Sequence, residues 1–207
     1  VGFECGRLFA EYGADVIKIE SRSYPDFIRV VMSTEMSASF ASSSRSKRGF
    51  GVNLKHARGL ELVRSLIERA DVVIENSATG TLDAMGVGFA EIRKRNPRCV
   101  LVSSQLLGSR GAWKDWIGYG PSTQPIGGLV HLWNYADAAE PAGSTSIFPD
   151  HVAGRLAALV GLAALVRRER TGTGGHGEVA QAEAVTNMIG DLLLQEGVRP
   201  GSVAPAG

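Results

Sequence analysis

The stretch "HARGLELVRSLIERADVVIEN", residues 56–76, holds a helix pattern that is followed directly by a strand pattern. In residues 56–70, apolar side chains recur at the spacing of three and four that gives a helix one apolar face, namely Leu60, Val63, Leu66 and Ile67. Residues 71–76 ("DVVIEN") form a short apolar run, which is typical of a strand buried on both faces. A helix joined to such a strand is the repeating unit of an α/β protein.

The same alternation extends in both directions along the chain. Further strand patterns lie at 14–20 ("ADVIKIE") and 99–105 ("CVLVSSQ"), and a short helix pattern lies at 90–96 ("AEIRKRN"). Buried strands that alternate with helices predict a parallel sheet covered on both faces, and right-handed crossovers make it doubly wound. We therefore expect an α/β fold: a Rossmann-like doubly wound parallel sheet with flanking helices, followed by a long helix from about residue 150 to 170 and a linker.

The two ends of the chain suggest a piece of a longer protein. The first residues read as a glycine turn at Gly2–Gly6, then a helix and a strand, whereas an α/β unit would place another strand before that turn. The last residues, 199–207 ("RPGSVAPAG"), read as a linker. We expect the N-terminal half of a longer chain, with its first strand missing.

Composition limits the class of protein. The chain has 207 residues, 44% hydrophobic and 21% charged, with a formal net charge of +1, so no bulk charge draws it to nucleic acid or to a membrane. Cys5 and Cys99 lie far apart and indicate neither a disulfide framework nor a zinc site. The longest apolar run, 156–166, is too short to span a bilayer. We expect a cytoplasmic protein that uses no metal, no nucleic acid and no membrane.

Asp150 stands where a polar, proline-containing segment gives way to an almost wholly apolar run. Aspartate is among the best helix N-cap residues, because its side chain accepts a hydrogen bond from a free backbone N–H in the first turn. A carboxylate at the mouth of a buried helix can also act as a nucleophile. From these residues alone the cap is the favoured interpretation.

Two other segments are candidates for ligand binding. Within residues 44–59, four cations near a sheet edge suit either a solvated loop or a phosphate-bearing ligand, namely Arg45, Lys47, Arg48 and Lys55. Asn76 follows a buried strand, at the edge where open α/β sheets bind ligands, although it could equally cap the next helix. The turn at Gly2–Gly6 with Glu20 at the next strand end resembles a dinucleotide site only weakly, because the full glycine fingerprint is absent.

Five segments, in order along the chain, resemble the family III CoA-transferases of the CaiB/BaiF type. They are "LFAEYGADVIKIE" (8–20), "RSKRGFGVNLK" (45–55), the stretch from "ADVVIENSATG" to "CVLVSS" (70–104), "GYGPSTQPIGGL" (118–129) and the stretch from "PDHVAGRL" to "VAQAEA" (149–184). The likeness covers nearly all of the chain.

The resemblance implies an activity. Asp150 matches the family nucleophile, which forms an aspartyl-CoA intermediate as CoA passes from an acyl-CoA donor to a small carboxylic acid. It further implies a CoA-binding domain at residues 1–149, and at 150–207 a catalytic helix, a strand–helix unit and the start of a linker. Members of the family form interlocked homodimers, so a homodimer is expected.

The resemblance also implies contacts to CoA. The matching positions are Val52, Asn53, Leu54, Lys55, Asn76, Ser77, Ala78, Met85, Tyr119 and Gly120. The chain departs from the family pattern at Ser21 and Ala84, where basic residues are common, and at Gly120, where an aspartate is common. The nearby cations that could replace the lost ones are Arg22, Arg45 and Lys47.

Three alternatives stay open. An α-methylacyl-CoA racemase shares the fold but uses a histidine in the loop where Tyr119 lies, since moving a proton on the substrate needs a second acid–base group. A nucleotide-binding module without catalysis is the second alternative. A nicotinamide-dependent oxidoreductase is the third, and the missing glycine fingerprint counts against it.

Overall fold

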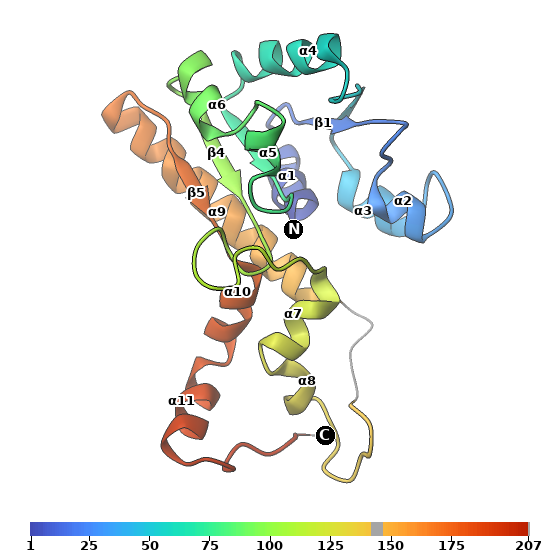
Figure 1. Ribbon diagram of the computed structural model, residues 1–207, viewed down its shortest axis with the longest axis vertical. Helices are drawn as coiled ribbons and strands as arrows, with labels where there is room; N and C mark the ends of the chain where they lie inside the picture. The colour runs from blue at the N-terminus through green and yellow to red at the C-terminus, as the bar shows by residue number, and fades with distance from the viewer. Residues whose placement is uncertain (142–146, 207) are drawn as a thin grey trace.

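The computed structural model describes residues 1–141 and 147–206. Its strands are β1 (Ile17–Glu20), β2 (Arg48–Gly51), β3 (Val72–Glu75), β4 (Val100–Ser103) and β5 (His176–Glu178). Its helices are α1 (Gly2–Glu11), α2 (Phe27–Val31), α3 (Ala38–Ser44), α4 (Ala57–Ile67), α5 (Thr81–Ala84), α6 (Phe89–Arg95), α7 (Gly120–Ile126), α8 (Leu129–Leu132), α9 (Phe148–Thr171), α10 (Gln181–Met188) and α11 (Gly190–Val198). Figure 1 shows their arrangement.

All the strand pairs of the described residues are parallel, as the sequence predicts. β1 pairs with β2, and β3, β4 and β5 form a second sheet in that order. In the second sheet Val72 is opposite Val100, and Leu101 is opposite His176. Each strand pair is joined through at least one helix, so the α/β class and the flanking helices are confirmed.

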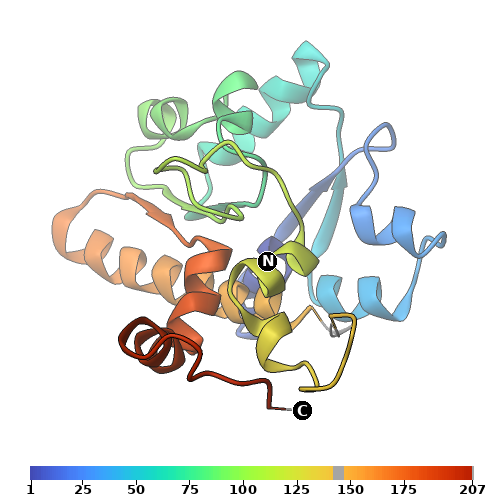
Figure 2. The ribbon, with the colours of Figure 1, turned by 60° about the horizontal axis from the view of Figure 1, so that its bottom comes forward.

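β4 is the centre of the molecule, because both of its faces are covered. Val100 and Val102 point to one face, where they pack with small residues of α1 and α9. Leu101 points to the other face and packs with residues of α4 and α6. Figure 2 shows α9 on one side of the strands and α4–α6 on the other. This period-two alternation along a fully buried strand is what a doubly wound sheet requires.

α9 packs closely because small residues line its buried face. A Cβ at Gly154 would lie 2.5 Å from the Cβ of Glu4 on α1, and one at Gly161 would lie 3.3 Å from Val102. By length and composition, α9 could cross a membrane. It has 24 residues, and its most apolar stretch of 18 residues has a mean hydropathy of 1.3, with 33% of that stretch buried. Core helices of soluble proteins show the same composition, so this is weak evidence for a span.

Two local predictions are wrong. Residues 2–6 belong to α1 rather than to a glycine turn, since Gly2 packs against Asn76 and Gly6 against Lys47, and this packing outweighs the low helix propensity of glycine. The long helix begins at Phe148, two residues before its predicted start. The division at 149/150 therefore falls inside the first turn of α9. β5, which lies beyond that division, pairs with β4, which lies before it.

Candidate active site

Several chain segments meet at the carboxyl ends of the strands. α1 leads into β1 through a turn at Gly13, and α9 leads into β5 through a turn at Gly172, both glycines having positive φ. A helix that runs antiparallel to the strand after it places its N-terminus at the carboxyl end of that strand. The first turns of α1 and α9 therefore lie at the edge of the sheets where open α/β folds bind ligands (Figure 1).

Asp150 lies in the first turn of α9 but does not cap it. Ile147 is the N-cap residue, and no side chain makes a capping hydrogen bond, so the favoured interpretation from sequence is wrong. Asp150 is half-buried, and its Oδ1 is buried without a hydrogen-bond partner among the described residues. Burial raises the pKa of the Asp150 carboxyl. A buried carboxylate oxygen without a partner is costly, and such groups are typical of functional sites.

Gly120 lies directly against this carboxylate. It is buried at the start of α7, and a Cβ placed on it would lie 2.7 Å from both Oδ1 and Oδ2 of Asp150 and 2.0 Å from Cγ2 of Ile147. No carbon–oxygen contact of that length is tolerated, so only glycine fits here without movement. The aspartate that resemblance led us to expect at this position would add a second carboxylate beside the first.

The carboxylate of Glu4 lies nearby and, unlike that of Asp150, has several hydrogen-bond and charged partners. The side chain of Glu4 on α1 is 6% exposed and accepts two hydrogen bonds from Arg7, at 2.6 and 3.0 Å. His151 and Arg155 of α9 each approach it at 3.4 Å. Burial raises the pKa of the Glu4 carboxyl, but the hydrogen bonds and charge of Arg7 and His151 together outweigh burial and hold the pKa below its ordinary value. Glu4 therefore ties α1 to the turn of α9 that carries Asp150.

Replacing Glu4 by glutamine is expected to reduce the free energy of unfolding by about 2 kcal/mol at pH 7, because Arg7 loses a charged hydrogen-bond partner. Folding lowers the pKa of Glu4 below its ordinary value of 4.5. The ionised Glu4 therefore stabilises the folded protein fully above pH 4.5, and this stabilisation is lost as the pH falls through the folded pKa. Urea unfolding at a series of pH values measures both effects.

Glu61→Gln is the matched control, because the Glu61 side chain is 56% exposed and its loss should cost under about 0.5 kcal/mol. If the loss of unfolding free energy in Glu4→Gln stays constant down to acid pH, the charge of Glu4 is not the cause of that loss.

The residues expected to bind CoA lie along the same edge. Asn76 follows β3, and its Nδ2 donates to the carbonyl oxygen of Ser104 at 2.5 Å, which joins the ends of β3 and β4. Ser77 donates its backbone N–H to Glu75. A cavity of about 210 Å³ opens beside Ala78 at this edge, although Asp150 does not line it.

One apolar cluster gathers three of the expected contacts that lie far apart in the sequence. Val52, Leu54 and Met85 all pack against the buried side chains of α4 and α6. The backbone of Asn53 is held close to α4, since a Cβ at Gly59 would lie 2.1 Å from its carbonyl oxygen. The segment after β2 and the segment after β3 thus meet in one apolar cluster.

Of the four cations named above, Arg45, Lys47 and Arg48 have partners within the protein. Arg45 pairs with Glu11, and Arg48 pairs with Asp15 at 2.8 Å. Lys47 donates to two backbone carbonyls, and burial lowers its pKa to about 8. Lys55 differs, because its amine contacts the hydroxyl and ring of Tyr24 and has no carboxylate partner among the described residues.

These pairings narrow the choice of phosphate contacts. Arg45 and Lys47, which the sequence offered as replacements for the missing basic residues, already have partners. Lys55 and the exposed Arg22 have no carboxylate partner in residues 1–141 and 147–206, and neither has the exposed Arg58 in the first turn of α4.

Tyr119 is exposed and stacks on Phe27 of α2, with ring centroids 4.8 Å apart and an angle of 10° between the planes. α2 follows the carboxyl end of β1, where Asp26 and Glu20 bind Lys18. The tyrosine therefore links the loop that carries Gly120 to the edge of the first sheet.

Comparison with known proteins identifies the family. The model described as CoA-transferase family III matches residues 1–207, which is the whole chain. The chain belongs to CoA-transferase family III.

Its relatives agree with this assignment. It is 39% identical over 211 residues to a probable CoA-transferase of Mycobacterium tuberculosis, covering 98% of this chain and 26% of that protein. It is 33% identical over 192 residues to the formyl-CoA:oxalate CoA-transferase of Streptomyces avermitilis, covering 88% of this chain and 44% of that one. A CaiB/BaiF family protein from Brucella suis has a crystal structure that matches with a TM-score of 0.91 at 29% identity, over 99% of this chain and 56% of that chain.

The chain thus spans between about a quarter and a half of the length of these curated relatives. The resemblance to family III and the fold class are confirmed. The contacts of Gly120 and Glu4 with α9 were not found from sequence. Gly120 was noticed only as a departure from the family pattern, and nothing near Glu4 in the sequence signals its partners on α9.

Proposed function

We propose that this family III chain provides the nucleophile and part of the CoA site of an acyl-CoA:carboxylate CoA-transferase. The observation that carries the proposal is the environment of the Asp150 carboxylate. Its Oδ1 is buried and has no hydrogen-bond partner among the described residues, burial raises its pKa, and Gly120 packs against both of its oxygens. Relatives that are named CoA-transferases support the reaction class.

Asp150 would begin the reaction as a carboxylate. One of its oxygens attacks the thioester carbonyl carbon of the acyl-CoA, the C–S bond breaks, and CoA leaves as a thiolate. The product is a mixed anhydride between the acyl group and Asp150. The Asp150 carbonyl carbon of this anhydride then accepts the thiolate and releases the donor acid as a carboxylate, which leaves an aspartyl-CoA thioester.

The second half repeats these steps in reverse with the acceptor acid. The acceptor carboxylate attacks the aspartyl thioester and displaces the thiolate, and the acyl carbon of the new anhydride takes the thiolate back and frees Asp150. No proton is gained or lost in the cycle, so no general base is required. A carboxylate in a partly dry site is also less solvated and hence more nucleophilic than one in water.

The CoA part of the substrate would lie along the carboxyl edge of the sheets. Lys55 offers a cation without a carboxylate partner for a phosphate, and the backbone and side chains of Val52–Leu54, Asn76–Ala78 and Met85 offer polar and apolar contacts. Tyr119 and Gly120 would border the thioester. The small carboxylic acid as acceptor and the homodimer expected from the resemblance are part of the same proposal.

A trapping experiment tests the covalent step. The protein is incubated with succinyl-CoA or formyl-CoA without an acceptor and quenched with hydroxylamine or borohydride. The expected result is a hydroxamate, or after reduction a homoserine, on the peptide that contains Asp150. If the peptide stays unmodified while CoA transfer proceeds once an acceptor acid is added, the aspartyl intermediate is rejected.

A parallel arm separates transfer from racemisation. A branched acyl-CoA is incubated in deuterated water without any acceptor acid, and deuterium at the α-carbon is measured by mass spectrometry. We expect no incorporation, because Tyr119 stands where a racemase would need its second acid–base group. Deuterium uptake without transfer would replace the proposal by the racemase.

A further inference from the structure

Lys55 and Tyr24 meet at the carboxyl edge of the first sheet, although 31 positions separate them in the sequence. The Lys55 amine donates to the Tyr24 hydroxyl and lies 4.2 Å from the centroid of its ring. The strands that precede them, β1 and β2, are parallel and paired so that Glu20 is opposite Gly51. Both chain segments therefore leave the sheet at the same edge, and the contact joins the loop after β1 to the segment after β2.

A turn in the first loop sets the direction of Tyr24. Ser21 Oγ accepts a hydrogen bond from the backbone N–H of Ser23 at 3.2 Å, and the carbonyl oxygen of Ser21 accepts one from the backbone N–H of Tyr24, also at 3.2 Å. Serine hydroxyls that bond the backbone two residues on stabilise such turns. Ser21 stands where the resemblance to family III leads us to expect a basic residue. The serine supplies no charge, but it builds the turn that brings Tyr24 to Lys55.

The backbone of Lys55 is held in a second turn. Its N–H donates to Oδ1 of Asn53 at 3.0 Å, and the N–H of His56 donates to the carbonyl oxygen of Asn53 at 3.1 Å. A lysine ammonium sits on a flexible four-carbon stem, so a fixed backbone alone does not fix the position of the charge. The contact with Tyr24 does, because it holds the far end of the stem.

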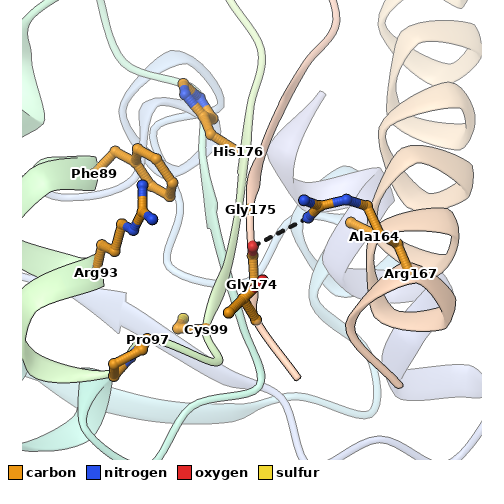
Figure 3. A pocket seen from close by; sticks show the side chains of 10 residues that line it. Phe89, Arg93, Pro97, Cys99, Ala164, Arg167, Gly174, Gly175 and His176 are labelled. Atoms are coloured by element: carbon orange, nitrogen blue, oxygen red, sulfur yellow. Dashed lines mark hydrogen bonds between the residues drawn. The ribbon is translucent and has the colours of Figure 1, made fainter. Parts of the chain in front are cut away.

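In the described part of the chain, no such contact joins two cations at the opposite edge of the second sheet. A cavity of about 420 Å³ there borders Cys99 and Gly174, which lie just before β4 and β5. Arg93 of α6 and Arg167 of α9 lie on opposite sides of the segment that leads into β5 (Figure 3). Arg167 donates to the carbonyl oxygen of Gly174 at 3.2 Å. Because these two side chains do not converge, this cavity offers no assembled site for a phosphate.

We propose that Tyr24 is a positioning residue that holds Lys55 ready for a CoA phosphate, which rests on the proposed function of the chain. Holding the ammonium at the sheet edge before CoA arrives reduces the conformational entropy that Lys55 loses on binding. An ammonium has three N–H donors, and the Tyr24 hydroxyl takes one, which leaves two for phosphate oxygens. A carboxylate in this place would neutralise the ammonium, whereas a hydroxyl and an aromatic ring hold it without removing its charge.

Calorimetric titration of the protein with CoA tests this role, and it needs no turnover. Lys55→Ala is expected to weaken CoA binding about tenfold or more, since it removes a charge-assisted contact. Tyr24→Ala is expected to weaken binding about fivefold, and Tyr24→Phe about twofold, since phenylalanine keeps the ring contact. The double variant Tyr24→Ala/Lys55→Ala should bind CoA no more weakly than Lys55→Ala alone, because Tyr24 acts through Lys55.

Two controls separate this role from a general effect on the surface. Arg58 is an exposed cation in the first turn of α4. If Tyr24 acts only through Lys55, the losses caused by Tyr24→Ala and Arg58→Ala should multiply in the double variant, because the two residues act independently. Tyr135 is 62% exposed, close to the 58% of Tyr24, and Tyr135→Ala should leave the affinity for CoA unchanged.

Three results would overturn the role of Tyr24: unchanged CoA affinity in Tyr24→Ala, unchanged CoA affinity in Lys55→Ala, or a Tyr24→Ala/Lys55→Ala loss equal to the product of the two single losses. Each of them leaves the trapping at Asp150 untouched, so covalent transfer can hold while this role fails. Failure of the trapping would reject the transferase and leave the CoA titration intact. Thermal unfolding shows which variants retain the fold, and if Tyr24→Ala does not fold, the same cycle is run with Tyr24→Phe.

Discussion

Replacing Asp150 by asparagine or alanine is expected to lower the turnover of CoA transfer by at least about 10⁴-fold, because loss of a covalent nucleophile removes the whole catalytic route. The measurement is the rate of new acyl-CoA formation at saturating donor and acceptor. The matched control is Asp191→Asn, since Asp191 is an exposed aspartate in the first turn of another helix, α11. The control should retain full turnover.

Asp150→Asn also has a predicted effect on stability. Measuring that effect tests whether the loss of turnover is caused by unfolding. Burial raises the pKa of Asp150 above its ordinary value of 3.8, so the folded protein holds this carboxyl more readily in its neutral form. The ionised carboxylate therefore reduces stability at neutral pH, and the reduction disappears below 3.8. Asp150→Asn is expected to unfold at a higher urea concentration than the parent at pH 7, with the difference vanishing in acid.

The raised pKa also predicts the pH dependence of the reaction. Only the carboxylate is a nucleophile, so kcat/KM should fall with decreasing pH, and the midpoint should lie above the 3.8 of an ordinary aspartate. An Asp150→Asn protein with near-normal turnover, or one that is less stable than the parent at pH 7, would contradict this account of the site.

Gly120→Ala is expected to lower kcat about 100-fold and to reduce the free energy of unfolding by about 1–3 kcal/mol, because the added carbon displaces a packed catalytic group. The methyl group would lie 2.7 Å from both oxygens of Asp150 and 2.0 Å from Ile147, so the first turn of α9 has to move. KM for the acyl-CoA should change little, since Lys55 and Asn76 are untouched. Steady-state kinetics and urea unfolding measure these three quantities.

Gly197→Ala provides the comparison for this glycine. Gly197 lies inside α11 with no heavy atom within 4 Å of its added Cβ, so alanine should stabilise the protein by up to about 1 kcal/mol and leave kcat unchanged. If Gly120→Ala leaves kcat and the free energy of unfolding as Gly197→Ala does, the close approach of Gly120 to Asp150 does not affect catalysis.

The local patterns of the sequence were sufficient for the class of fold and for much of the candidate site. Residues 99–102, which lead into and form most of β4, are all apolar, and this predicts a strand covered on both faces. The residues after β3 had to lie at its carboxyl end. Asn76, Lys55 and Asp150 were all chosen from sequence, and all lie after a strand or at a helix start on the same edge.

What the sequence by itself determined is the alternation of helices and strands, because a periodic apolar pattern depends on residues a few positions apart. Only the tertiary structure decided that α1 includes Gly2 and Gly6, that Glu4 pairs with residues of α9, and that Gly120 touches Asp150. Those features depend on contacts between residues far apart in the chain. The same reason explains why Asp150 is not a cap: its oxygens are turned toward a segment that precedes it by many residues, and no local pattern records that segment.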